Sequence, residues 1–260
     1  MVRMRFSGLA LLFVLLASVS ARAQGGPPMI TDDPDTPGNH HWEINVADIG
    51  EFARAQTLNL APYFDVNYGL GDRIQLKVEG GYGTEADTGL RVQSGFGPLL
   101  TGVKWRFWDQ DKDGFLSVST YPQFSFHPVY TSKDAEIAAS GNYWLVPLEF
   151  SKRLGPFAVN PEVGYQYFTQ TGYQDLAQQD DAWFYGIVGD YEPWKDFELL
   201  AELHGDSVVS GGTNDLLFNI GTRVPFSEKV LLIASAGHTI KTLPGVPPQY
   251  LAYLGLQFRL

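Results

Sequence analysis

Hydrophobic and polar side chains alternate with a period of two along most of this chain, from Trp42 to the C-terminus. In a β-strand, successive side chains point to opposite faces, so the pattern predicts strands with one hydrophobic and one polar face. The alternation is clearest in the last strand, where Gly255, Gln257 and Arg259 share the polar face. The hydrophobic face of that strand carries Leu254, Leu256, Phe258 and Leu260.

Earlier segments repeat this pattern. Leu58, Leu60, Phe64 and Val66 fall on one predicted face, and Asn59, Tyr63, Asp65 and Asn67 fall on the other. We count about twelve such strands, an even number, as outer-membrane barrels of a single bacterial chain have. No helical periodicity competes with the strand pattern.

The predicted connections separate into two length classes. Short turns are expected at 69–72, 109–114, 154–156, 192–195 and 225–228, and longer loops at 84–95, 128–142, 169–181, 205–213 and 239–249. The two classes alternate along the chain, except for a short first hairpin at 53–56. Short periplasmic turns and long extracellular loops characterise outer-membrane barrels. The sequence therefore predicts a single closed antiparallel transmembrane barrel over residues 41–260, with both termini in the periplasm and a closing strand that contains Tyr253, Gly255, Phe258 and Leu260.

The N-terminus carries the features of a secretory signal peptide. Arg3 and Arg5 precede an apolar run at 9–19, and Ala21 and Ala23 provide the small residues of a cleavage site. The run is too short to cross a bilayer as a helix. We therefore expect residues 1–23 to be removed. Residues 24–40, rich in Gly, Pro and Asp, should form an extended periplasmic lead segment.

Charge and composition narrow the classes of partner. The formal net charge is −11, and the predicted leader holds three arginines and no acid, so the exported chain is more acidic still. This argues against nucleic acid as a partner. The absence of cysteine excludes disulfides and thiolate metal sites. We expect no cofactor; the expected partners are outer-membrane lipid, lipopolysaccharide, the barrel-assembly machinery and a small solute.

Several short runs resemble the outer-membrane family grouped as the MetA-pathway of phenol degradation, or transporter-like, family. They are ITDDPDTPG at 30–38, HWEIN at 41–45, GVKWRF at 102–107, YPQF at 121–124, VPLE at 146–149 and FNIG at 218–221. The resemblance implies an outer-membrane barrel involved in the passage of aromatic or other hydrophobic compounds. None of the runs is a catalytic signature.

The predicted inward face is strongly charged. Its members are Glu43, Asp65, Arg73, Lys77, Glu79, Lys104, Arg106, Glu149, Glu162, Glu198, Glu202 and Arg223. Charges in an interior need partners or water. They could line a narrow hydrated channel and select solutes, or form ion pairs that fill the lumen. Twelve strands lie between the eight that leave a filled interior and the sixteen that leave an open channel, so both interpretations stay open.

Prolines mark part of the predicted wall as irregular. Pro122, Pro147 and Pro161 lie in three consecutive predicted strands, and Pro62 lies in an earlier one. Proline cannot donate a ladder hydrogen bond and is normally found at edges or bulges. The three neighbouring prolines could mark a lateral opening through which an apolar solute leaves the lumen, or bulges that only curve the barrel.

Other candidate chemistry is weaker. Asp109, Asp111, Asp113 and Gly114 resemble the first half of a calcium loop, but Thr120 stands where the final acid is expected, and a polar turn is the favoured interpretation. His40 and His41 are adjacent and diverge in a strand, so no metal site is expected. A lipid hydrolase would need a serine and histidine in contact, and Ser125, His127, His204 and His238 form no convincing set.

These patterns predict a passive outer-membrane channel for small, hydrophobic or aromatic solutes, and not an enzyme. Lumen charges and loops would set its selectivity. The alternatives are a structural or surface-interaction barrel with a plugged lumen and, third, an outer-membrane lipid hydrolase.

Overall fold

The computed structural model describes residues 26–54, 56–87, 92–126, 137, 142–170, 181–211, 214–242 and 249–260. The predicted leader, residues 1–23, lies outside them. The first half of the sheet contains β1 (Trp42–Ala53), β2 (Gln56–Gly69), β3 (Ile74–Asp87), β4 (Gln93–Phe96), β5 (Leu99–Trp108), β6 (Ser117–Thr120) and β7 (Gln123–Phe126). The second half contains β8 (Asn142–Leu154), β9 (Phe157–Gln170), β10 (Ala182–Trp194), β11 (Phe197–Val208), β12 (Leu216–Ser227), β13 (Val230–Lys241) and β14 (Gln249–Arg259).

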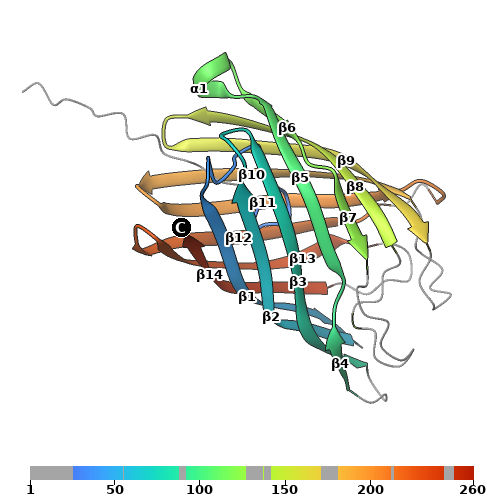
Figure 1. The fold of residues 1–260 in the computed structure, drawn as a ribbon. Helices are drawn as coiled ribbons and strands as arrows, with labels where there is room; N and C mark the ends of the chain where they lie inside the picture. The colour runs from blue at the N-terminus through green and yellow to red at the C-terminus, as the bar shows by residue number, and fades with distance from the viewer. Residues whose placement is uncertain are drawn as a thin grey trace, which may run out of the picture.

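The sheet closes on itself between its first and last strands (Figure 1). β1 and β14 pair in antiparallel register from Glu43 opposite Arg259 to Ala53 opposite Gln249. Trp42 and Leu260 extend the seam through two main-chain hydrogen bonds of 2.8 and 2.9 Å. The predicted closed antiparallel barrel is confirmed.

The fourteen segments make twelve strands, because two strands are interrupted. β4 and β5 both pair with β3 and are separated by Gly97 and Pro98. β6 and β7 both pair with β5 and with β8, and Tyr121 and Pro122 separate them. A proline without an amide hydrogen stands at each interruption, in agreement with the limits on proline in a ladder.

Connections at one end of the barrel are short, and most of those at the other end are longer. At the short-turn end, β8 and β9 are joined by Gly155 and Pro156. The connection from β5 to β6 contains the one-turn helix α1 (Gln110–Asp113), capped by Asp109. None of the helices among the described residues is long and apolar enough to cross a membrane.

The outer face is hydrophobic and the inner face near the short-turn end is polar. Neighbouring residues on β5 illustrate this, since Trp105 is 54% exposed and Lys104 is 1% exposed. Aromatic pairs such as Trp42 with Tyr68, 4.6 Å between ring centroids, cluster on the outer face near the short turns. Such aromatic girdles are typical of the interfaces of outer-membrane barrels.

A bulge in β2 corrects part of the predicted face pattern. The register of β2 against β1 shifts between Tyr63 and Leu60, so Ala61 and Pro62 together oppose the single residue Asp48. Beyond this point the alternation is inverted, because an extra residue in one strand moves the following side chains to the opposite face. Leu60, predicted to share the outward face of Phe64, points inward.

Near the long loops, hydrophobic side chains join polar ones on the inward face. Glu51 and Glu85 share this face with Leu58, and Asp206 shares it with Phe184. The hydrophobic inward positions are buried or half-buried. They include Ile49, Leu58, Leu60, Leu100, Leu145, Phe168, Phe184, Leu217 and Leu251. We call this region the upper lumen, and the polar region near the short turns the lower lumen.

Candidate functional site

The lower lumen is occupied by residues 26–37, which we call the inner segment. These residues precede β1 and turn back into the barrel (Figure 1). Thr31 is fully buried, and Met29, 5% exposed, packs against Val188 and Leu200 of the wall. We expected this part of the chain to extend into the periplasm. It folds inward because the lumen offers charged partners for its main-chain groups and for its aspartates.

Arg223 of β12 binds the start of the inner segment. Its guanidinium donates to the carbonyl oxygen of Pro27, at 2.8 Å from Nη2 and 3.1 Å from Nε, and to that of Gly26 at 3.3 Å. Glu198 of β11 accepts from Nη1 at 2.5 Å and balances the charge. The Ser235 hydroxyl of β13 donates to the carbonyl oxygen of Pro28 at 2.7 Å.

Two wall carboxylates accept main-chain amides from the middle of the inner segment. Glu202 accepts from the amides of Ile30 at 3.0 Å and Thr31 at 2.6 Å. Glu162 of β9 accepts from the amide of Asp32 at 2.9 Å. Buried main-chain amides need acceptors, so these contacts hold the segment in place.

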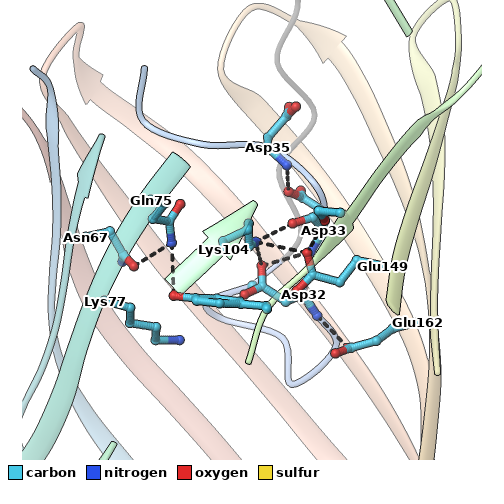
Figure 2. A network of polar contacts seen from close by, with 12 residues as sticks. Asp32, Asp33, Asp35, Asn67, Gln75, Lys77, Lys104, Glu149 and Glu162 are labelled. Atoms are coloured by element: carbon cyan, nitrogen blue, oxygen red, sulfur yellow. Dashed lines mark hydrogen bonds and ion pairs between the residues drawn. The ribbon is translucent and has the colours of Figure 1, made fainter. Parts of the chain in front are cut away.

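Lys104 is the centre of a buried polar network around the aspartates of the inner segment (Figure 2). Its Nζ lies 2.9 Å from Asp32 Oδ1 and 3.4 Å from Glu149 Oε2, and it donates to the main-chain oxygen of Asp33. The Tyr121 ring lies beneath it, with the ring centroid 4.7 Å from Nζ. Lys104 therefore joins β5, β8 and the inner segment.

Asp32 and Asp33 have opposite electrostatic environments. Burial alone would raise the pKa of Asp32, but the charges of Lys104 and Lys77 lower it below its ordinary value. Burial raises the pKa of Asp33 well above its ordinary value, and the neighbouring Asp35 adds to this. Asp33 Oδ1 accepts the amide of Asp35 at 2.7 Å, while its Oδ2 has no hydrogen-bond partner within the described part of the chain.

The inner segment leaves the lumen beside Arg106. This side chain contacts Asp35 at 2.6 Å, Asp109 at 3.5 Å and the carbonyl oxygen of Asp72 at 2.8 Å. Arg73, predicted to line the lumen, lies at the mouth of the barrel, where it contacts Asp113 at 2.7 Å.

The remaining predicted lumen charges form a second inward group on β1, β2 and β3. Lys77 lies 2.8 Å from Glu79 and 3.9 Å from Asp65. Asp65, 1% exposed, also accepts from Asn45 and Asn67. Glu43 is half-buried beside them. Eleven of the twelve predicted charges thus face the interior, and Arg73 is at its rim.

Two glycines of the wall provide space for the inner segment. A β-carbon at Gly186 would lie 1.9 Å from the hydroxyl oxygen of Thr31, and one at Gly221 would lie 2.3 Å from the terminal methyl of Met29. At Gly186 any side chain would collide with Thr31, whereas at Gly221 a β-carbon would also lie 2.8 Å from the main-chain oxygen of Ala234. The wall is therefore shaped to accept this segment.

Two cavities lie beside the inner segment among the described residues. A cavity of about 20 Å³ lies among Asp33, Asp65, Lys77 and Lys104, which is enough for about one water molecule. A wider cavity of about 210 Å³ opens below it toward the short turns, and the two share Asp35 and Thr36 as lining residues. The lower lumen is therefore narrow, hydrophilic and charged.

A different hollow lies on the outer face, where β2 and the β4–β5 strand are both irregular. It has a volume of about 330 Å³ and is bordered by Pro62 and Pro98. Its lining is mainly hydrophobic and includes Phe64, Val66, Val78, Tyr82, Phe96 and Leu99. Gly80 and Gly81 of β3 form its base, so the wall here is backbone without side chains.

Strand pairing in the predicted irregular wall at Pro122, Pro147 and Pro161 is less disturbed than at the apolar hollow. Pro122 interrupts the strand between β6 and β7. Pro147 pairs with Gly164 and Pro161 pairs with Ile187 within continuous strands. The apolar hollow is thus at Pro62, which sequence reasoning noted, and at Pro98, which it missed.

The weaker candidate sites have ordinary partners. Asp109, Asp111 and Asp113 cap α1 or pair with Arg106, Arg153 and Arg73. His40 contacts the Tyr68 hydroxyl at 2.8 Å, and His41 the carbonyl oxygen of Asn39 at 2.9 Å. Within the described ranges, no three His, Asp or Glu residues are grouped to hold a metal ion.

The serine and histidine residues weighed for a hydrolase lie apart or elsewhere. Ser125 is buried on the inward face of β7, and His127 is outside the described residues. His204 is 3.5 Å from the Thr31 hydroxyl oxygen, and His238 contacts the carbonyl oxygen of Gln249 at 3.0 Å.

Comparisons with known proteins support the fold. The chain is similar to an outer-membrane channel from Pseudomonas putida F1, with a TM-score of 0.69 and 14% identity over 88% of this chain and 98% of that one. It is also similar to the NanC porin, with a TM-score of 0.61 and 11% identity over 84% of this chain and 100% of that one. The KdgM porin, solved in complex with oligogalacturonate, has a TM-score of 0.55 and 10% identity over 82% of this chain and 98% of that one.

Sequence comparisons give no family. No family model matches the chain, and no curated protein matches it in sequence. The resemblance to the phenol-degradation family therefore stays a prediction. At the identities found, the structural likeness shows the fold of outer-membrane channel barrels and nothing finer.

Proposed function

We propose that this protein is a passive outer-membrane channel for small hydrophobic solutes. The observation that carries the proposal is the division of its interior. The upper lumen presents hydrophobic side chains such as Leu60, Leu100 and Phe184 between its polar ones, whereas the lower lumen is charged and occupied by residues 26–37. An apolar solute entering between the long loops would find a compatible compartment that is closed below it.

The apolar hollow offers such a solute a lateral exit. It lies on the outer face of Gly80 and Gly81, and the inward side of the same stretch faces the upper lumen beside Leu60 and Tyr63. Because both glycines lack side chains, a small local shift of β4 away from β3 would connect the two spaces. We therefore place the lateral route at Pro62 and Pro98, and keep Pro122, Pro147 and Pro161 as the alternative wall.

In this account the lumen charges exclude hydrophilic solutes rather than guide them, since residues 26–37 bind most of them. Location in the outer membrane, export by the predicted leader and contact with lipopolysaccharide belong to the same proposal. The fold supports them, as does the hydrophobic outer face.

Entry of a hydrophobic dye tests the proposal. In cells that retain their lipopolysaccharide, expression of the protein should accelerate entry of N-phenylnaphthylamine, which fluoresces in membranes. Val78→Trp, which fills the hollow, should abolish the acceleration. Val103→Trp is the matched control. Val103 of β5 is 49% exposed and, like Val78 of β3, lies on the outer face of the barrel, but it is outside the hollow.

The second candidate, a structural barrel with a plugged lumen, is favoured by the narrowness of the lower lumen. It predicts that dye entry is the same with and without the protein. Equal inhibition by the two tryptophan variants would instead contradict the lateral route while leaving a channel.

A further inference from the structure

We propose that the lower lumen is a peptide-binding site, and that residues 26–37 are its tethered and exchangeable ligand. The site recognises an extended main chain with carboxylates that accept amides and cations that bind carbonyl oxygens. This inference concerns binding and holds independently of which solute the channel passes.

Most contacts between the wall and the inner segment are made with the main chain of the segment. Glu202 and Glu162 accept three amides of the inner segment. Arg223, Ser235 and Lys104 donate to the carbonyl oxygens of residues 26, 27, 28 and 33. In contrast, the side chain of Ile30 is not needed for these contacts, and this residue is 46% exposed.

The segment contributes little that the barrel needs in order to stay closed. The ladder between β1 and β14 begins at Glu43, beyond the inner segment. Met29 provides its one apolar anchor in the buried cluster with Val188 and Leu200. Withdrawal of the segment would therefore break side-chain contacts in a polar interior, where water can replace them, and leave every strand pairing intact.

Composition favours rapid rebinding. The twelve residues contain four prolines, which restrict the free chain and reduce the entropy lost on binding. Three aspartates and no basic residue give the segment a charge opposite to Lys104 and Arg106. Both properties suit a short peptide that leaves and returns to one site.

The test begins with the full chain, so that folding is not in question. A protease recognition sequence inserted after Asn39, which is exposed, would be cut after the barrel has folded. We expect the severed segment to remain bound and to exchange with a fluorescent peptide of residues 26–37, to a limit of one per barrel. The proposal is overturned if the severed segment departs and the labelled peptide does not bind, or if the segment cannot be exchanged.

Two matched comparisons test the mode of recognition. A peptide methylated on the Thr31 amide, which removes the donor to Glu202, should bind about tenfold or more weakly. A peptide with Ile30→Ala should bind within about twofold of the parent, because that contact is not part of the recognition. Equal weakening of both would contradict main-chain recognition.

The wall is tested in the same assay. Glu202→Gln should weaken binding, whereas Glu51→Gln on β1, which lies toward the long loops, should not. Peptide binding is read by fluorescence anisotropy in detergent and does not require conduction. A barrel that binds the peptide but admits no dye would contradict the proposed channel alone, and one that admits dye but never binds the peptide would contradict this inference alone.

Discussion

Gly186 of β10 faces Thr31 so closely that a β-carbon at position 186 would lie 1.9 Å from the Thr31 hydroxyl oxygen. At Gly189, three residues along the same strand, the nearest atom would be the carbonyl oxygen of Ala201 at 4.0 Å. One glycine is required by the inner segment and the other is not. Comparing substitutions at the two glycines therefore distinguishes an effect of contact with the inner segment from a general effect of changing β10.

This difference predicts that Gly186→Val displaces the inner segment, because the added side chain occupies the position of Thr31. The chain has no cysteine, so a single Met29→Cys reports displacement through its reaction with a maleimide. We expect labelling to be about tenfold faster or more, since overpacking typically costs about 1–3 kcal/mol. Gly189→Val, as the control, should leave the rate unchanged. Equal rates in the two variants would mean that the wall does not hold the segment at this point.

Removing only one partner of the Arg223–Glu198 ion pair should lower the free energy of unfolding more than removing both. Arg223→Met leaves Glu198 buried without its partner, a change that typically costs about 3–5 kcal/mol. Combining Arg223→Met with Glu198→Met should recover part of the loss, because Glu198 is then no longer a buried charge, while the carbonyl oxygens of Gly26 and Pro27 still lack their donor. Urea unfolding in detergent, followed by tryptophan fluorescence, measures both variants. A loss below about 1 kcal/mol in the single variant would indicate that the pair is solvated rather than buried.

Removing the charge of Asp32 and removing the charge of Asp33 should have opposite effects on the binding of the inner segment. The lowered pKa of Asp32 means that its ionised form favours the bound segment at pH values above 3.8, and that this contribution is lost as the pH falls through its lowered pKa. The raised pKa of Asp33 means the reverse: its ionised form weakens the bound segment increasingly as the pH rises above 3.8, up to the raised value.

At pH 7 we therefore expect Asp32→Asn to accelerate maleimide labelling of Met29→Cys, and Asp33→Asn to slow it. The first change removes a charged contact with Lys104, of the kind worth about 1.5–3 kcal/mol. Because maleimide reacts with the thiolate, each rate is divided by that of free cysteine at the same pH. On this scale, lowering the pH from 7 to 5 should slow labelling in the parent, and this effect should shrink in the Asp33→Asn variant. Acceleration by both substitutions would contradict the assigned electrostatics.

The sequence was sufficient to predict the barrel because strand faces and loop lengths are local patterns. Closure, which pairs Glu43 with Arg259, follows from them because a sheet in lipid cannot leave an open edge. The last strand alternates strictly, and Gly255 and Gln257 indeed face inward while Leu254 faces outward. The interior position of charges such as Lys104 and Glu202 followed from the same alternation.

The contents of the lumen were not predictable in this way. Residues 26–37 have no periodicity, and their position depends on partners distant in sequence, such as Glu202, which is 171 residues from Thr31. The available signal was complementarity: an aspartate-rich, proline-rich segment beside a lumen that contains Lys104, Arg106 and Arg223. Pro98 was missed because it lies between the predicted loop at 84–95 and the alternating pattern that begins near Gly102.

The bulge in β2 gives a further prediction about faces. Leu60 should be accessible from the lumen and Asn59 from the lipid, the opposite of what alternation from Phe64 indicates. Asn59 donates to Asp48 at 2.5 Å on that outer face. In a cysteine-free chain, Asn59→Cys should react with a maleimide dissolved in the bilayer, and Leu60→Cys with a water-soluble one. The reverse result would place the register shift elsewhere.

Conductance of a barrel with a lockable inner segment tests the central claim most directly, that residues 26–37 close the lower lumen. The Ser235 hydroxyl donates to the main-chain oxygen of Pro28 at 2.7 Å, so Pro28→Cys combined with Ser235→Cys puts two thiols on contacting residues of the segment and the wall. Thr222→Cys with Ala234→Cys joins β12 to β13 away from the segment and serves as the control. We predict that, in planar bilayers, reduction of the first pair permits open-channel events that oxidation abolishes, with no such effect for the control. Identical records for the oxidised and reduced forms of the first pair would contradict the account.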